Sequence, residues 1–370
     1  MPINMNPFGS KIILNLSPSI FLTTAFLLLK TAPALAFDIH FDYSYDDNNF
    51  FSGSEGEIRK NTLDRAAQYY ETYINDNLSA ILEDASSPTG IGYEFPGGQK
   101  NTWTISFDDP ATGTKTSITD PTFIEDRIVI YVGGRELSSL GNGGTGGLSY
   151  SAFSGTSNGT SYSNEDFVNL VKGRGQAGAL TDPVTDIGLW GGSITFDNNI
   201  TIDSNTYNWH NEITPTGLDS DEYDFLSIAV HEIGHVLGIG GQSWDNNVSG
   251  TDFTGDDSIS AYNQANNLNA SAVPLHTTST SHWLDGTEGL TLQGINQETV
   301  LDPSILNGQR KLPTNLDYAG LSDIGWEVER AAINANVPFE FSPALGVLLS
   351  CSFFSCMSIK NWLKKVRLNR

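Results

Sequence analysis

Cysteine is nearly absent from this chain of 370 residues, which contains only Cys351 and Cys356. Both lie in an apolar segment near the C-terminus, so the rest of the chain has neither a disulfide nor a thiol. The main fold must therefore be held together by its hydrophobic core.

Positive charge is also scarce. The formal net charge is -24, and the stretch 201–300 contains no Lys or Arg at all. All 43 acidic residues lie between positions 37 and 340, whereas seven of the 19 basic residues lie outside that range. Such a chain repels nucleic acid, which excludes nucleic acid as a partner. Cationic or neutral peptides are better received, although acidity can also serve solubility alone.

Histidine is scarce as well, with 6 in the chain, yet two of them stand in the run His231-Glu232-Ile233-Gly234-His235. Residues four apart share one face of a helix, so both imidazoles can reach one ion. Glu232 can reach a water at that ion and take its proton. The pattern predicts the zinc site of a hydrolase, with Glu232 as the general base.

The residues around this motif favour a helix. Asp219 and Ser220 are expected N-caps, and acidic residues up to Asp224 suit the first turn. Gly238 is expected to end the helix one turn after His235.

A catalytic zinc needs a third protein ligand and an open position for water. The compact pattern HExxHxxGxxH would place a third histidine at position 241, where this chain has glycine. After His235 only His276 and His282 remain. His282 is preferred because Trp283 beside it can shield the site, whereas His276 stands among Thr and Ser and is expected in solvent.

Two carboxylates are further alternatives for the third ligand. Glu288 and Glu298 follow the motif, but both lie among Gly, Thr, Asn and Gln without helical periodicity. A rigid carboxylate ligand from a second helix is therefore not favoured.

Later landmarks follow in a recognisable order: residues 252–262, then 273–275, then Ser281-His282-Trp283. With the motif they resemble the leishmanolysin-like metzincins, zinc endopeptidases whose third histidine arrives late from a loop. The resemblance covers roughly residues 185–330. It implies an α+β zincin fold with a mixed twisted sheet, a helix carrying HEIGH and a mostly irregular C-terminal subdomain. It also implies Zn2+ ligands at His231, His235 and His282 and a peptide or protein substrate.

The chain departs from that family in places. Leu301 stands where the family has a methionine below the zinc, but the two are similar in volume and the residue is not a ligand. The absence of disulfides points to a bacterial branch. Residues 316–326 look like the closing helix of bacterial relatives. The alternative function is a surface or matrix protein, structural or adhesive, that keeps the fold without proteolysis.

Residues 190–197 read as a strand that resembles the edge strand of the metzincin cleft, on which an extended peptide can pair. An ordinary core strand is the alternative. Asp197 and Asp203 with nearby Asn residues are a candidate Ca2+ site, and solvated acidic loops are the alternative.

The N-terminal half has weaker patterns. Residues 57–82 favour an amphipathic helix with a core-facing side, and residues 127–132 favour a strand. Residues 133–159 are rich in Gly, Ser and Thr and are expected to form a long surface loop.

The two ends predict export. Lys11, an apolar run over 20–29 and Ala34-Leu35-Ala36 are typical of a secretory signal peptide, so the mature protein is expected to begin at Phe37. At the other end, Val337-Pro338-Phe339-Glu340 precedes an apolar segment and a basic tail. This order resembles the bacterial PEP-CTERM signal, which implies an exosortase-like processing enzyme as a partner. A plain single-pass anchor is the alternative, with the basic tail inside in both cases.

The expected organisation has four parts. Residues 1–36 are the signal peptide, and 37–240 are the N-terminal part of the metalloprotease domain with its active-site helix. Residues 241–336 are the C-terminal subdomain with the third zinc ligand, and 337–370 are the sorting signal with a transmembrane segment. The protein is thus expected at the cell surface or outside, anchored to the membrane at least for a time.

Overall fold

The computed structural model describes residues 37–335, apart from 88–89, 96–97, 153 and 158–159. The expected signal peptide (1–36) and sorting tail (337–370) lie outside the described residues. Within the described part, no helix is both long and apolar enough to span a bilayer. The secondary structure there is mixed α+β, with several small sheets.

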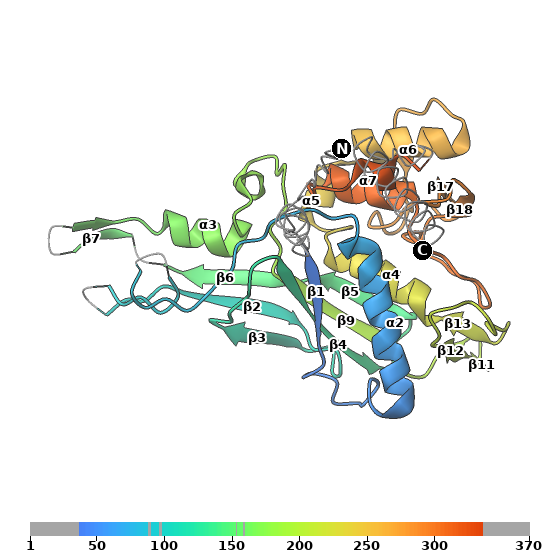
Figure 1. Ribbon diagram of the computed structural model, residues 1–370, viewed down its shortest axis with the longest axis horizontal. Coiled ribbons are helices and arrows are strands. Elements are labelled where there is room, and N and C mark those ends of the chain that lie inside the picture. The colour runs from blue at the N-terminus through green and yellow to red at the C-terminus, as the bar shows by residue number, and fades with distance from the viewer. Residues whose placement is uncertain (1–36, 88–89, 96–97, 153, 158–159, 336–370) are drawn as a thin grey trace, which may run out of the picture. The chain divides into compact units, whose positions relative to one another are not determined.

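The main sheet has the strand order β1-β4-β9-β5 (Figure 1). Its strands are β1 (Asp38–Asp42), β4 (Arg127–Arg135), β9 (Gly191–Asp197) and β5 (Gly141–Thr145). The first three run parallel, and β5 runs antiparallel to β9. The strand expected over 127–132 is confirmed as part of β4. Every residue of β9 is buried, which is typical of a strand covered on both faces.

The order of the strands corrects two expectations. Residues 190–197 do not form the edge of the sheet, because β9 lies between β4 and β5. The core-strand alternative is therefore right, and β5 is the edge strand. The long loop expected over 133–159 is also wrong, because β5, β6 (Gly147–Ser151) and β7 (Gly155–Ser157) occupy much of it, and β8 (Thr160–Tyr162) follows directly.

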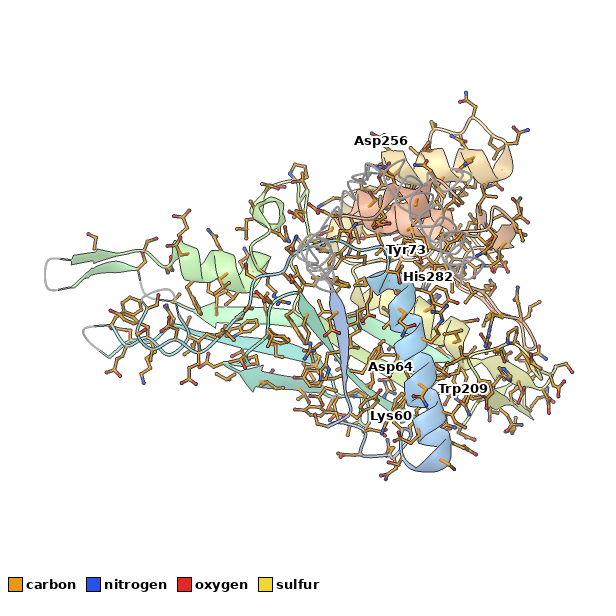
Figure 2. All side chains as sticks on the ribbon, viewed as in Figure 1. Lys60, Asp64, Tyr73, Trp209, Asp256 and His282 are labelled. Carbon is orange, nitrogen blue, oxygen red and sulfur yellow. The ribbon has the colours of Figure 1, made fainter. Side chains whose placement is uncertain are left out.

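The first long helix, α2 (Gly53–Glu71), packs beside α4 (Phe225–Val236) against the main sheet (Figure 1). Leu63, Ala66, Ala67 and Tyr70 are buried at the spacing of one helical face. Asp64, on the same helix, is exposed (Figure 2). The expected helix over 57–82 is right in type, but the observed helix ends eleven residues earlier.

A second apolar cluster joins the main sheet to the sheet β3-β2-β6. It includes Trp103 and Phe107 on β2 (Thr102–Asp108), Tyr131 on β4, and Trp190 just before β9. The third strand is β3 (Lys115–Thr119). This sheet covers one face of β9, and the helices cover the other. β9, with which the edge strand β5 pairs, is therefore fixed from both sides.

The chain after α4 is mostly irregular. The predicted closing helix over 316–326 is confirmed as α7 (Asn315–Asp323), which packs against α6 (Asp256–Asn266).

The remaining elements, before and after α4, are short: α3 (Glu165–Gly173), η1 (Ala177–Leu180), β10 (Thr201–Ile202), β11 (Asn205–Thr206), β12 (Asn208–His210), β13 (Glu222–Asp224), α5 (Gln242–Asp245), β14 (Val248–Ser249), β15 (Asp252–Phe253), β16 (Val273–Pro274), β17 (Glu288–Leu290), β18 (Asn296–Glu298) and α8 (Arg330–Ile333).

Candidate metal centre and active site

The helix that carries the motif starts later than the sequence suggests. Asp224 is its N-cap, and its carboxylate accepts a hydrogen bond from the N–H of Ser227 over 3.0 Å. Arg310 pairs with the same carboxylate at 2.6 and 2.9 Å. The expected caps Asp219 and Ser220 are wrong, because the residues that follow them form β13, which pairs with β12. Several residues before the helix could cap it, and the pairing of β13 with β12 together with the contact from Arg310 selects Asp224.

The helix ends at Val236, close to the predicted stop. Gly238 has a φ of +108°, in the region that L side chains rarely adopt, so a glycine is required there. The chain then turns so that the carbonyl of Ile239 lies beside the ring of His235.

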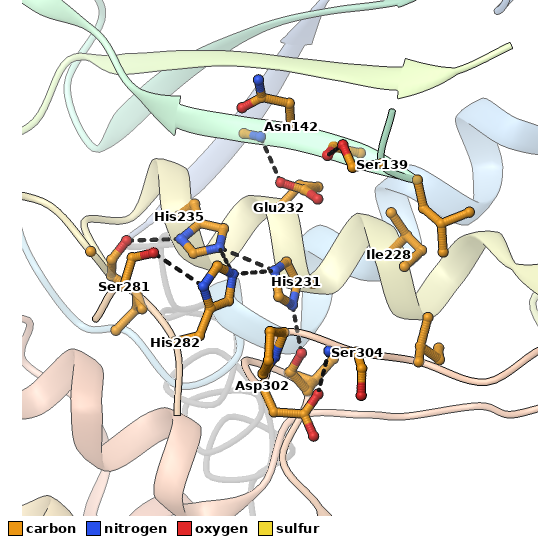
Figure 3. A pocket seen from close by; sticks show the side chains of 18 of the residues that line it. Ser139, Asn142, Ile228, His231, Glu232, His235, Ser281, His282, Asp302 and Ser304 are labelled. Carbon is orange, nitrogen blue, oxygen red and sulfur yellow. Dashed lines mark hydrogen bonds between the residues drawn. The ribbon is translucent and has the colours of Figure 1, made fainter. Parts of the chain in front are cut away.

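Three histidine rings converge on one point (Figure 3). The Nε2 atoms of His231 and His235 lie 3.1 Å apart, those of His235 and His282 3.1 Å, and those of His282 and His231 3.3 Å. His231 and His235 come from α4. His282 comes from the irregular segment that follows, 46 residues after the last residue of α4, Val236. The structure thus brings together the three residues expected as zinc ligands.

The opposite nitrogens of two rings have carbonyl partners. His231 Nδ1 lies 2.7 Å from the carbonyl oxygen of Val300, and His235 Nδ1 lies 2.9 Å from that of Ile239. A carbonyl only accepts, so both Nδ1 atoms carry the proton and both Nε2 atoms present a lone pair. The hydroxyl of Ser281 lies 3.1 Å from His282 Nδ1 and suits the same tautomer. Lone pairs that face each other at such distances repel, and a bound cation would remove this repulsion.

The spacing fits zinc. Tetrahedral coordination with Zn–N bonds of about 2.0–2.1 Å places the nitrogens about 3.3–3.4 Å apart. The three observed separations are 3.1, 3.1 and 3.3 Å. His231, His235 and His282 would hold the ion, and all three line the pocket.

Local electrostatics keep the three rings neutral, as metal ligation requires. Burial, together with the neighbouring rings, holds the pKa of His231 well below its usual range. Burial likewise lowers the pKa of His235, and it lowers that of His282 to about 3.

The other candidate ligands lie elsewhere. The ring of His276 contacts the hydroxyl of Thr278 at 3.3 Å and does not belong to the converging group. Glu288 is an exposed residue of β17. Glu298 of β18 pairs with Lys311 at 2.7 Å.

Glu232 lies on the side of α4 that faces the edge strand (Figure 3). Its Oε2 accepts a hydrogen bond of 2.6 Å from the N–H of Gly143 on β5. Burial raises the pKa of this carboxyl to about 8, and the bond from Gly143 opposes the rise. The carboxyl is thus fixed in place by the backbone of the sheet edge.

Glycine is needed at two positions of β5 for this contact. A Cβ at Gly141 would lie 2.5 Å from Glu232 Oε1, and one at Gly143 would lie 2.5 Å from the backbone oxygen of Glu232. Side chains there would push the strand away from the helix. This role was not predicted from the sequence, although the glycines of Gly141-Asn142-Gly143-Gly144 are the feature that indicates it.

The outer edge of β5 is free of strand pairing among the described residues. The carbonyl of Leu140 accepts a hydrogen bond from the N–H of Asp197, and the N–H of Gly146 donates one to the carbonyl of Gly191. Because every second residue of an antiparallel strand bonds to its neighbour, the even-numbered residues of this segment bond to β9. Gly141, Gly143 and Thr145 therefore direct their backbone groups outward. They border a pocket of about 820 Å³ that contains the three histidines and Glu232.

Leu301 packs below the helix between the two motif histidines. A Cβ at Gly234 would lie 2.7 Å from its Cδ2, so the glycine of the motif leaves room for this side chain. Leu301 is fully buried. It therefore packs against the helix at Gly234, between the two motif histidines in the sequence.

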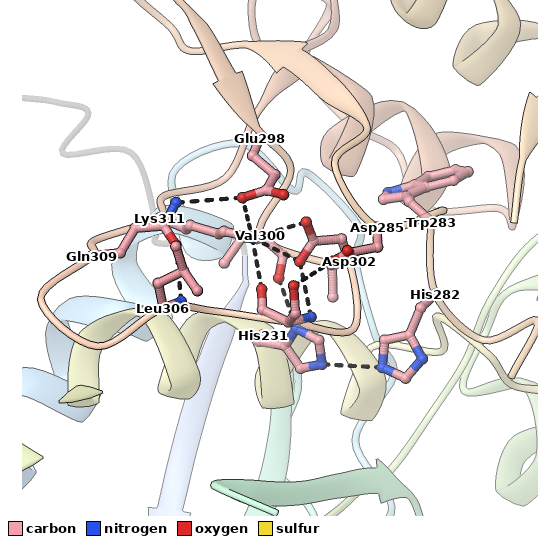
Figure 4. Close-up of polar contacts among 12 residues, drawn as sticks. His231, His282, Trp283, Asp285, Glu298, Val300, Asp302, Leu306, Gln309 and Lys311 are labelled. Carbon is pink, nitrogen blue, oxygen red and sulfur yellow. Dashed lines mark hydrogen bonds and ion pairs between the residues drawn. The ribbon is translucent and has the colours of Figure 1, made fainter. Parts of the chain in front are cut away.

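A buried lysine lies beside the pocket (Figure 4). The Nζ of Lys311 contacts Asp302 at 2.8 Å, Glu298 at 2.7 Å and the carbonyl of Ser304 at 2.6 Å. Asp285, Glu298 and Asp302 form an acidic group, and this ammonium already occupies it. The group is thus an ion-pair network. No feature of the sequence indicates it.

The proposed calcium ligands have other partners. Asp197 is buried and accepts hydrogen bonds from the N–H groups of Leu137 and Asn199. Asp203 lies in the turn between β10 and β11. A Ca2+ ion at these residues stays a prediction.

Comparison with known proteins leaves the site to be judged on its geometry, because no protein-family model, curated protein or solved structure matches this chain.

Proposed function

We propose that this protein is an exported zinc-dependent endopeptidase with a metzincin-like, leishmanolysin-like fold. The observation that carries the proposal is the convergence of three Nε2 atoms within 3.1–3.3 Å of one another, next to a fixed carboxylate in an open pocket. A structural metal site normally has four protein ligands, whereas three ligands beside a pocket suit catalysis.

The chain's own residues have separate tasks in this mechanism. Zinc, when bound by His231, His235 and His282, supplies Lewis acidity that activates a water and polarises a peptide carbonyl. Glu232 accepts the proton of that water and returns it to the leaving amine. The positive charge of a bound zinc ion would lower the pKa of Glu232 and so favour the carboxylate form, which can accept a proton.

The edge strand supports a peptide substrate. The outward groups of Gly141, Gly143 and Thr145 can pair with an extended chain, which selects for backbone rather than sequence. The N–H of Gly143 is already bonded to Glu232, so pairing there is shared with the general base. The strongly acidic composition favours cationic or neutral peptides over anionic ones.

Export is part of the proposal. The expected signal peptide and the PEP-CTERM-like tail support a location at the cell surface or outside, with an exosortase-like enzyme as processing partner. The membrane contact would then be made by the C-terminal segment.

The proposal is tested by digestion of casein or gelatin with the full chain, with and without a chelator, alongside the zinc content. We expect one zinc per chain and proteolysis that the chelator abolishes and zinc restores. A chain that binds zinc but cleaves neither protein would instead favour a structural or adhesive surface protein. The leucine at position 301, where the family has methionine, is the sequence feature that supports this alternative.

A further inference from the structure

A single buried carboxylate connects the two segments that complete the candidate metal centre. Asp317, on α7, is fully buried. Its Oδ1 accepts hydrogen bonds from Trp283 Nε1 at 3.2 Å and from the N–H of Leu301 at 3.3 Å. Its Oδ2 accepts one from the N–H of Val300 at 3.2 Å.

Each of these partners adjoins a metal-ligating histidine. Trp283 directly follows His282, and it packs against Trp244 and Phe253 at ring distances of 4.8 and 5.3 Å. The carbonyl of Val300 accepts the Nδ1 proton of His231. The carboxylate of Asp317 therefore acts on two ligands from one point. It reaches His282 through the side chain of the next residue, Trp283, and it reaches His231 through the Val300–Leu301 peptide that orients the ring.

Helix capping accounts for only part of this arrangement. Asp317 is also the N3 residue of a capping box, and its Oδ2 accepts bonds from the N–H of Thr314 at 2.8 Å and from its hydroxyl at 2.9 Å. A cap needs no more than these. Oδ1 faces away from the helix start and bonds only to Trp283 and Leu301, outside the helix.

The partners of Asp317 are donors that suit an ionised acceptor, and their hydrogen bonds oppose the rise in its pKa that burial causes. All five bonds to the carboxylate come from N–H or O–H donors. An asparagine would present an NH₂ group to one set of these donors, whichever way its amide is turned. Loss of the charge also weakens the bonds that remain.

We propose that Asp317 is a positioning residue that sets His282 and His231 at the spacing required for zinc. This inference rests on the metal centre proposed above. Outer partners of metal ligands typically change affinity by about 10- to 100-fold when removed. We expect Asp317→Asn to weaken Zn2+ binding by that amount and to alter the visible absorption spectrum of the Co2+ form.

The chain offers matched controls. Asp323 lies on the same helix and is a half-buried carboxyl, but its oxygens accept the N–H groups of Asp257 and Ser258 at the start of α6. Thr314→Ala removes the cap of α7 while Asp317 keeps its bonds to Trp283, Val300 and Leu301. Both D323N and T314A should lower stability and leave zinc affinity and the cobalt spectrum close to those of the unchanged protein.

The experiment uses the full chain, with zinc affinity measured by competition against a chelator and stability measured without metal. Zinc binding by D317N as tight as that of D323N would overturn the inference and make Asp317 a helix cap only. If D317N does not fold, Trp283→Phe decides: it removes the Nε1 donor but keeps an aromatic side chain, and unchanged zinc affinity and an unchanged cobalt spectrum would overturn the inference. Absence of zinc from the unchanged protein would refute the metal centre itself.

Discussion

The N–H of Gly143 donates a 2.6 Å hydrogen bond to the carboxylate of Glu232. The edge of the main sheet and the candidate general base are thus directly joined. A strand that an extended substrate would pair with is also the element that fixes the group expected to move the proton. Substrate position and base position therefore depend on one backbone segment.

Gly143→Ala tests this relationship. Its Cβ would lie 2.5 Å from the backbone oxygen of Glu232, so β5 must move outward and release the carboxylate. A displacement of this order in an active site can lower turnover by about 10²-fold. Gly144→Ala is the matched control, because a Cβ there meets nothing within 4 Å. We expect kcat of G143A to be far below that of G144A. Equal kcat values would show that the contact has no role.

Glu232→Gln separates the base from the metal. The glutamine can still accept the bond from Gly143, but it cannot take a proton, so zinc should stay bound while kcat falls by about 10²-fold or more. Zinc content and casein cleavage are measured on the same preparation. Full activity of E232Q would remove Glu232 from the mechanism.

His282→Ala tests the third ligand. Loss of one of three converging nitrogens should weaken zinc binding by more than the roughly 10- to 100-fold typical of an outer partner. His276→Ala is the control, because that ring contacts Thr278 and lies outside the converging group. Metal content after dialysis gives the answer. A metal-free H276A protein and a zinc-loaded H282A protein would reverse the assignment.

The local part of the site was predictable from the sequence, because the spacing of His231, Glu232 and His235 is a property of one helix. The distant ligand was a choice between two histidines. Its place beside the others depends on Trp283 and on the buried Asp317, whose bonds join segments separated by many residues. Such contacts leave no periodic pattern in a sequence.

The edge strand could not be predicted, since Gly141-Asn142-Gly143-Gly144 has almost no intrinsic preference for a strand. It becomes one because β9 lies alongside and Glu232 requires close approach. The N-cap failed for a related reason. Several residues before the helix can cap it, and pairing of β13 with β12 together with Arg310 selects Asp224.

A buried carboxyl that does not line the pocket makes stability depend on pH. Asp76 is fully buried, and only its Oδ2 has a partner, the N–H of Glu327 at 2.8 Å. Burial, with the nearby charges of Glu327 and Asp186, raises its pKa from 3.8 to about 7. The folded state therefore binds a proton that the unfolded state releases between these two values.

The sign of the effect follows from that difference. Stability from the protonated Asp76 is fully present below about pH 4 and is lost as the pH rises through about 7. Asp76→Asn keeps the acceptor for Glu327 and does not titrate, so the unfolding free energy of the unchanged protein minus that of D76N should fall across this range. Asp84→Asn is the contrasting control, because bonds from Ser86 lower the pKa of Asp84. Its contribution should instead be lost toward acid pH. Denaturant unfolding at several pH values measures both differences, and parallel curves for D76N and the unchanged protein would show that folding does not raise the pKa of Asp76.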